Sequence, residues 1–206
     1  YFAEKGYSVC ALSLRGHGKS EAPRRFRWMR IADYVADVAR VIGEMPQPPV
    51  IVGHSMGGLV VQKYLENHAA PAAVLMASVP VSGIYRTSLR IVRRHPIKFM
   101  KMNLTWRMYP IIERPHLTRE LFFSDTIPAD VLNEYFRLMQ DESYMALMDM
   151  LVLNLPKPKK VSTDLLILGA EKDTIFHPGE IEATAAAYGK KAEIFENMAH
   201  DMMLEP

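Results

Sequence analysis

The stretch Gly53-His54-Ser55-Met56-Gly57-Gly58 lies between a short apolar run and a segment with helical periodicity. Residues 50–52 are β-branched and follow two prolines, so they predict a buried strand. Residues 59–64 keep helical spacing without a breaker. A strand, a tight turn and a helix are therefore expected to meet at Ser55. This G-x-S-x-G pattern exposes a nucleophilic serine hydroxyl, and an ordinary tight turn is the alternative.

The length and composition indicate one globular domain. The chain has 206 residues, of which 49% are hydrophobic and 23% are charged. A net charge of +2 and the absence of a dense basic run argue against a nucleic-acid partner. The single cysteine, Cys10, lies in an apolar run and is expected to be a buried, inert thiol. No apolar run approaches the roughly 20 residues that span a membrane, and we expect a cytoplasmic location.

Apolar runs and amphipathic segments alternate along the chain. Strands are expected at residues 9–14, 50–52, 72–77, 165–168 and 192–195, and helices at 31–45, 59–66 and 180–188. Short links between them favour a mostly parallel α/β sheet flanked by helices. The loop at residues 15–20 has a glycine-rich pattern, but Ser13 occupies the position where a nucleotide-binding loop needs glycine, so a nucleotide site is rejected.

Residues 82–160 have a different character, because strand-like runs disappear and helical stretches are separated by prolines. We predict a core formed by residues 1–81 and 161–206, with 82–160 inserted into it. The insertion is basic as far as Phe122 and acidic from there to Pro156. One interpretation is a basic face that contacts an anionic membrane surface or substrate. The simpler one is two helical layers with complementary faces. Some of its methionines are expected to line an apolar pocket.

Three polar residues follow predicted strands in the order Ser55, Asp173, His200. Carboxyl ends of parallel strands meet at one edge of a sheet, where ligands bind. A serine hydroxyl becomes a nucleophile when a base accepts its proton and a third group orients that base. The sequence therefore predicts a catalytic triad of these three residues.

Other polar residues compete for these roles. Glu171 is close enough to replace Asp173 as the acid, whereas Asp164 precedes its strand and belongs to the opposite end of the sheet. His177 shares a loop with the acid, Asp201 is expected to point away from the site, and His54 is expected to support packing. The seven histidines form no familiar metal-binding spacing, so we predict no metal.

Four motifs carry a resemblance to a known family. They are LRGHGKS at 14–20, GHSMGG at 53–58, GAEKD at 169–173 and MAHD at 198–201. The chain resembles α/β-hydrolase-fold serine hydrolases over nearly its whole length, and is most similar to the lysophospholipase, monoacylglycerol lipase and carboxylesterase group. The resemblance implies that 82–160 form a helical cap, that the backbone N–H of Met56 is one donor of the oxyanion hole, and that no cofactor is needed.

Two departures from the family pattern matter. Ser13 stands where the family often has aspartate, which affects support of the loop at 14–20. Family members also carry about three strands before the segment that begins here at Tyr1, ending in a His-Gly motif whose loop supplies the second oxyanion donor. That donor has no candidate in the 206 residues, and a closing helix is expected beyond His200. We therefore expect the chain to be a fragment of a longer, active protein.

The leading hypothesis is hydrolysis of a small-molecule or lipid-like carboxylic ester with a lipophilic acyl group. Acyl transfer, or cleavage of a thioester, an amide or a C–C bond on the same triad, is the alternative within the fold. A non-enzymatic ligand-binding protein that retains the elbow is the alternative from another class. The sequence does not indicate an oligomeric state.

Overall fold

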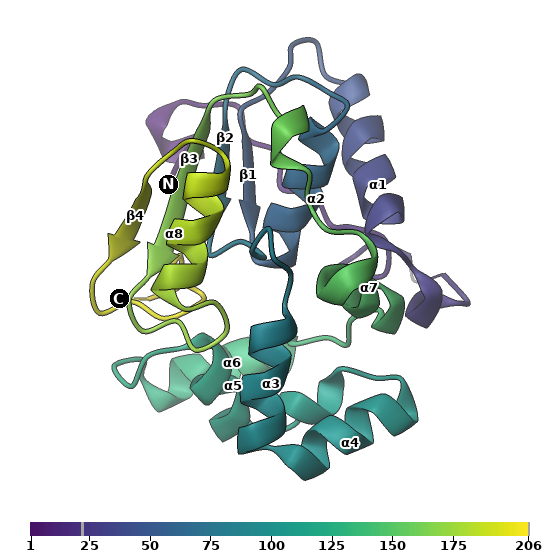
Figure 1. The fold of residues 1–206 in the computed structure, drawn as a ribbon, viewed down its shortest axis with the longest axis vertical. Helices are drawn as coiled ribbons and strands as arrows, with labels where there is room; N and C mark the ends of the chain where they lie inside the picture. The colour runs from purple at the N-terminus through teal and green to yellow at the C-terminus, as the bar shows by residue number, and fades with distance from the viewer. Residues whose placement is uncertain (22, 206) are drawn as a thin grey trace.

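A computed structural model describes residues 1–21 and 23–205. Four parallel strands form one sheet, in the spatial order β1-β2-β3-β4 (Figure 1). The strands are β1 (Ile51–His54), β2 (Ala73–Met76), β3 (Leu165–Ala170) and β4 (Ala192–Phe195). Gly53 pairs with Leu75, and Leu75 pairs with Ile167, so the carboxyl ends of neighbouring strands lie together. The predicted parallel α/β sheet is confirmed.

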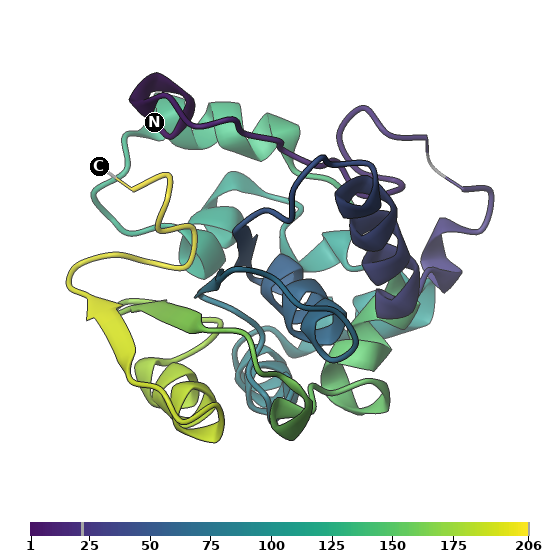
Figure 2. The same cartoon turned by 90° about the horizontal axis from the view of Figure 1, so that it is seen from above.

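Helices cover one face of this sheet. Helix α2 (Met56–Leu65) packs on β1 and β2, α8 (Pro178–Ala187) packs on β3 and β4, and α1 (Ile31–Gly43) packs against α2 (Figure 2). Leu75, Ile167 and Ile181 are fully buried between the sheet and these helices. The predicted helices at 31–45, 59–66 and 180–188 are thereby confirmed, with boundaries shifted by one or more residues.

The opposite face of the sheet is only partly covered. Val52 of β1 is 51% exposed and Leu166 of β3 is 42% exposed, whereas Met202 packs against Leu168. The prediction that residues 50–52 are a buried strand was therefore right about the strand and wrong about its burial. An apolar run indicates a strand that can be buried. Tertiary structure determines whether another segment of the chain covers it.

The predicted strand at residues 9–14 is wrong. This segment has no strand assignment and runs exposed as far as Ser13, with Leu14 partly buried. Cys10 is exposed rather than buried, which corrects the second expectation for this run. A strand needs a neighbouring chain for its backbone hydrogen bonds, and that pairing cannot be deduced from the apolar pattern of one segment.

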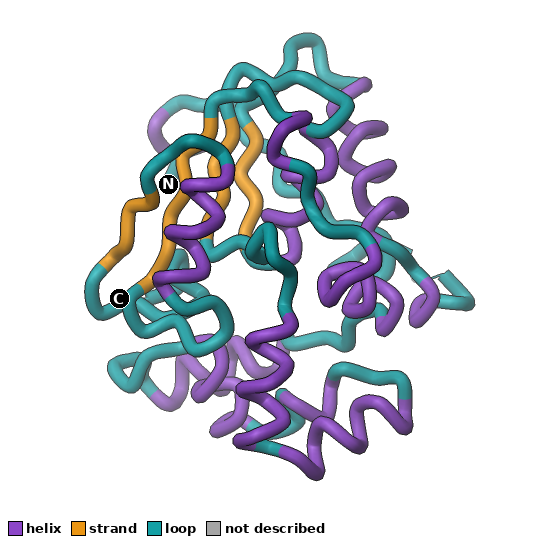
Figure 3. The backbone as a smooth tube through the Cα atoms, viewed as in Figure 1, coloured by secondary structure: helices purple, strands orange, loops and turns teal. Residues whose placement is uncertain are grey.

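Residues 82–160 are helical, as predicted, and contain no strand among the residues described. Their α-helices lie beyond the carboxyl ends of the strands or beside α2 (Figures 1 and 3). They are α3 (Tyr85–Arg94), α4 (Pro96–Thr105), α5 (Pro115–Phe122), α6 (Ala129–Leu138) and α7 (Tyr144–Met148). Prolines begin α4 and α5 and immediately precede α6, because a first-turn residue has no intrahelical N–H bond to lose. We refer to residues 82–160 as the helical insertion.

Oppositely charged side chains of the helical insertion face one another. Arg94 pairs with Glu120 at 3.0 Å, Lys101 with Glu113 at 3.0 Å, and Arg107 with Asp141 at 2.7 Å. Much of the basic character seen in the sequence is thus neutralised locally. Among the described residues, no helix combines the length and the apolarity that crossing a membrane requires.

Candidate active site

Ser55 lies on a sharp turn between β1 and α2. Its backbone has φ 52° and ψ −121°, a conformation that L-residues rarely adopt. Hydrogen bonds enforce it, because the Ser55 carbonyl accepts from Gly58 N at 3.0 Å and Val79 N at 3.1 Å, and Ser55 N donates to the Met76 carbonyl at 3.1 Å. The turn has the strand–turn–helix geometry expected for a nucleophile elbow.

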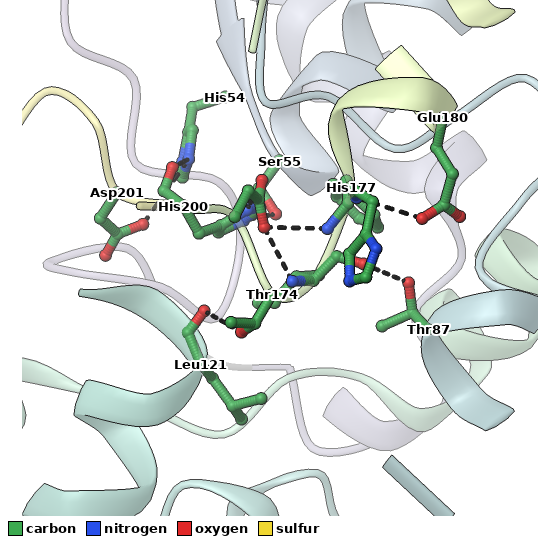
Figure 4. A network of polar contacts seen from close by, with 12 residues as sticks. His54, Ser55, Thr87, Leu121, Thr174, His177, Glu180, His200 and Asp201 are labelled. Carbon is green, nitrogen blue, oxygen red and sulfur yellow. Dashed lines mark hydrogen bonds and ion pairs between the residues drawn. The ribbon is translucent and has the colours of Figure 1, made fainter. Parts of the chain in front are cut away.

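The structure brings Ser55, His200 and Asp173 together from three separate parts of the chain. His200 Nε2 lies 2.9 Å from Ser55 Oγ, and Figure 4 shows these two residues close together. His200 Nδ1 lies 2.8 Å from Asp173 Oδ2. His200 is fully buried and Asp173 nearly so. The tautomer that fits has Nδ1–H donating to the carboxylate while Nε2 accepts from the serine hydroxyl. This arrangement can accept the serine proton and stabilise the resulting imidazolium.

The competing acids lie elsewhere. Glu171 Oε2 accepts from Asn197 N at 2.8 Å, and Asp164 pairs with Lys190 at the opposite end of β3. His177 directly precedes α8, and its backbone N donates to Glu180 Oε2 at 3.1 Å. Among the acids weighed from the sequence, Asp173 is the one placed against His200.

His54 contacts the loop after β4 that carries His200, rather than Ser55. Its Nε2 donates to the His200 carbonyl at 2.9 Å, and its ring lies 4.8 Å from that of His200. Burial lowers the pKa of His54 to about 4, so the ring is neutral at pH 7. Asp201 Oδ1 lies 3.6 Å from His54 Nε2, and burial raises the pKa of its carboxyl to about 6. Asp201 is therefore turned away from Ser55, as expected.

His54, His200 and Asp201 form a cluster whose potential metal-ligand atoms lie within 4.8 Å of one another. Both ring nitrogens of His200 already contact Ser55 and Asp173, and His54 Nε2 contacts a backbone carbonyl. A metal bound at this cluster would have to compete with the serine–histidine–aspartate contacts. The contacts of the cluster thus indicate hydrogen bonding within the loop that carries His200, rather than a cation site.

Aromatic rings enclose the base. The ring of Phe176 lies 5.3 Å from that of His200 and edge-on to it, and the ring of Phe122 lies 5.7 Å away. Phe122 comes from the helical insertion and Phe176 from the turn after β3. Neither was predicted from the sequence to contact His200, because a buried phenylalanine near a catalytic base carries no local sequence signal.

An apolar cavity of about 270 Å³ opens at Ser55 and Met56. Its wall is formed mainly by aliphatic, methionine and phenylalanine side chains of the helical insertion, such as Ile91, Met102 and Leu147. A second cavity, of about 410 Å³, lies between α5 and the turn after β3. Its lining includes charged residues and not Ser55, so the smaller cavity is the one suited to a substrate.

The loop at residues 15–20 fastens the helical insertion to the core. His17 Nε2 lies 3.0 Å from Glu142 Oε2, and Gly18 N donates to Gln140 Oε1 at 2.9 Å. The hydrogen bond that His17 donates to the Glu142 carboxylate raises the pKa of His17. The glycine-rich loop that superficially resembles a nucleotide-binding loop therefore contacts the wall of the apolar cavity, to which Gln140 and Glu142 both contribute.

Residues 1–206 match the family Hydrolase_4, described as serine aminopeptidase, S33. The chain belongs to this family. Among curated proteins, it is 37% identical over 84 residues to a non-heme haloperoxidase of Rhodococcus erythropolis and 37% identical over 85 residues to a non-heme chloroperoxidase of Burkholderia pyrrocinia. These matches cover 39% and 41% of this chain but only 30% of each relative.

Solved structures show the same fold. An esterase from Exiguobacterium antarcticum matches with a TM-score of 0.67 and 21% identity, over 93% of this chain and 74% of the esterase. Polyneuridine aldehyde esterase matches with a TM-score of 0.71 and 18% identity, over 98% and 84%. A monoacylglycerol lipase from Paleococcus ferrophilus matches with a TM-score of 0.65 and 19% identity, over 93% and 74%. The chain has the α/β-hydrolase fold, as the sequence motifs predicted.

Proposed function

We propose that this member of the hydrolase family cleaves a carboxylic ester with a lipophilic acyl group. The observation that carries the proposal is the position of His200, within 2.9 Å of a serine hydroxyl and 2.8 Å of a buried carboxylate. The arrangement occurs at a strained turn that opens into an apolar cavity. A binding protein has no physical need for three aligned polar groups at strand ends, so the geometry favours an enzyme.

The proposed reaction has two halves. Ser55 Oγ attacks the acyl carbon while its proton moves to His200 Nε2, and Asp173 holds the ring and stabilises its positive charge. The backbone N–H of Met56 donates a hydrogen bond to the negative charge that develops on the carbonyl oxygen. This N–H has no intrahelical partner because Met56 begins α2. His200 then protonates the departing alkoxide, which leaves as the alcohol. Water attacks the acyl-enzyme with His200 again as base, and the carboxylic acid and free Ser55 are released.

The cavity supports a lipophilic acyl group. Its lining is largely aliphatic and aromatic, and most of its polar side chains already have partners within the protein. Burying an alkyl chain there removes apolar surface from water, at roughly 25 cal/mol per Å². A cationic acyl group would lose its hydration without gaining a counter-charge, because the Glu142 carboxylate is already paired with His17.

A fluorophosphonate probe tests the nucleophile directly. We expect the full-length protein to be labelled at Ser55, located by peptide mass analysis, and Ser55→Ala to lose the label. Ser88→Ala is the matched control, because Ser88 lines the same cavity without contacting His200. Absence of labelling in the wild type, or labelling that survives Ser55→Ala, would overturn the proposal.

A substrate panel separates the other reactions open to the same three residues. Esters of increasing acyl length, thioesters, aminoacyl amides and a C–C bond substrate should be compared by kcat/KM, with an alcohol acceptor added to detect acyl transfer. The family description and the names of the curated relatives justify an aminopeptidase substrate and a peroxide-dependent halogenation assay. We expect esters to be cleaved fastest. Tight binding without turnover would favour a non-enzymatic protein.

The helical insertion also supports a proposed contact with an anionic lipid surface. On α4, Ile97 and Leu104 are 73% and 75% exposed, and Met100 between them is exposed as well. Their spacing places them along one side of the helix. We expect co-sedimentation with phosphatidylglycerol vesicles but not phosphatidylcholine vesicles, and a clear loss of binding for Ile97→Glu with Leu104→Glu. Equal sedimentation of this double variant would contradict the contact.

A further inference from the structure

The candidate acid Asp173 is held by the turn that carries it. One carboxylate oxygen, Oδ2, contacts His200, while the other accepts from Ile175 N at 2.7 Å and Phe176 N at 2.9 Å. Both donors are backbone groups of the turn between β3 and α8. The position of the carboxylate therefore depends on the conformation of residues 173–177, which we call the acid turn.

Two helices of the insertion hold the acid turn from outside. On one side, Thr87 Oγ1 of α3 donates to the Ile175 carbonyl at 2.6 Å, and Arg90 of α3 donates to the same oxygen. On the other side, Thr174 Oγ1 lies 2.8 Å from the Glu120 carbonyl and 3.3 Å from the Leu121 carbonyl of α5. Figure 4 shows Thr174 beside Leu121. The Ile175 carbonyl that α3 holds in place therefore lies next to the two N–H groups that bind Asp173.

Arg90 also reaches the far end of the acid turn. Its guanidinium contacts Glu180 Oε2 at 2.8 Å, and that oxygen accepts from His177 N at 3.1 Å. Glu180 is almost completely buried. Within the described residues, Arg90 Nε and Glu180 Oε1 are buried without a hydrogen-bond partner. A buried ion pair that leaves polar atoms without partners contributes little to stability. Its effect on the position of the acid turn is therefore the better explanation for it.

The same contacts adjoin the substrate cavity. Thr87, Ile175 and Phe176 all contribute to the wall of the cavity at Ser55. Phe176 also packs edge-on against the His200 ring. A continuous set of contacts therefore joins α3 and the cavity wall to the residues that hold Asp173 against His200.

We propose that Arg90, assisted by Thr87, is a positioning residue that holds Asp173 in register with His200. The inference rests on the proposed function and deepens it, because it makes the reactivity of Ser55 depend on how α3 is seated. Arg90 does not touch the reacting atoms. It acts on Asp173 through the Ile175 carbonyl and through Glu180.

Variants of α3 provide the kinetic test. For Arg90→Met we expect kcat to fall about tenfold to a hundredfold, as for a displacement of up to about 1 Å, with KM changed less than about threefold. Thr87→Val should give a smaller loss in the same direction, and Thr87→Ser should retain activity because it keeps the hydroxyl. Arg93→Met is the matched control, since Arg93 is an exposed arginine of the same helix. Unchanged kcat in folded Arg90→Met and Thr87→Val would overturn the proposal.

A second measurement isolates the route through Asp173. In an Asp173→Asn background, Arg90→Met should no longer change the rate at which the fluorophosphonate probe labels Ser55. If Arg90→Met slows labelling equally in both backgrounds, Arg90 does not act through Asp173 and the proposal is wrong.

The histidine–carboxylate contact can also be observed without turnover. The Nδ1 proton of His200, shared with Asp173, should give a strongly downfield proton NMR resonance in the wild type and in Arg93→Met. In Arg90→Met it should move upfield or broaden, and an unchanged resonance would refute the positioning role. A wild type that neither turns over esters nor labels would instead overturn the proposed function, while this spectrum still tests Arg90.

Discussion

A methyl group added at Gly53 tests whether close packing under the elbow sets the position of Ser55. A Cβ at Gly53 would lie 2.6 Å from the backbone oxygen of Gly57 and 2.7 Å from Val61 Cγ2. By contrast, a Cβ at Gly57 would meet nothing within 4 Å. Gly53→Ala and Gly57→Ala therefore add the same methyl group on either side of the same serine, one into packed backbone and the other into open space.

The expected effects follow from these distances. The contact at Gly53 is about 0.8 Å shorter than ordinary van der Waals contact, and a displacement near 1 Å costs roughly a hundredfold in rate. Overpacking of this kind also costs about 1–3 kcal/mol of unfolding free energy. Gly57→Ala should instead be neutral or stabilising by up to about 1 kcal/mol, because alanine is the better helix former.

Two assays check the pair. Urea unfolding gives the change in free energy, and the second-order rate of fluorophosphonate labelling reports on Ser55 independently of substrate choice. We expect Gly53→Ala to label roughly 30- to 100-fold more slowly than Gly57→Ala. Equal labelling of the two variants, or a loss confined to Gly57→Ala, would refute the idea that packing between β1 and α2 positions the serine.

Three further variants probe burial and charge. Burial raises the pKa of Asp201 in the folded protein from the ordinary 3.8 to about 6. Its contribution to the free energy of unfolding therefore falls as pH rises from about 4 to 6. In urea unfolding, the unfolding free energy of Asp201→Asn should therefore equal that of the wild type at pH 4 and exceed it at pH 8 by at most about 3 kcal/mol. A higher unfolding free energy of the variant at pH 4 would contradict this. Arg30→Met should lower the unfolding free energy by about 2–3 kcal/mol, less than for a fully buried pair, since Arg30 is partly exposed and Asp149 is buried. An unchanged urea midpoint would count against the pair. Ile91→Trp should narrow the cavity and reduce kcat/KM for long-chain relative to acetyl esters about tenfold, whereas an equal loss for both would argue against an acyl site there.

The nucleophile elbow at Ser55 and the order of the polar residues could be predicted from the sequence, because each depends on a few neighbouring residues. Residues 50–64 specify strand, turn and helix through local patterns, and the strand β4 was predicted with its observed bounds. The predicted order of Ser55, Asp173 and His200 needs only the rule that parallel strands end at one edge. The same reasoning failed at residues 9–14, because an apolar run is compatible with a strand but does not supply its partner.

What the sequence alone determined is therefore the chemistry of single positions: a serine on a tight turn, a carboxylate and an imidazole at strand ends, and a helical insertion between β2 and β3. Tertiary structure decided which groups meet. The contacts of Arg90 and Thr87 with the acid turn join residues more than 80 positions apart, and the basic run that contains Arg90 gave no sign of a buried partner. Such contacts depend on how α3 packs against the turn after β3, and that packing is set by the whole hydrophobic core rather than by any one segment.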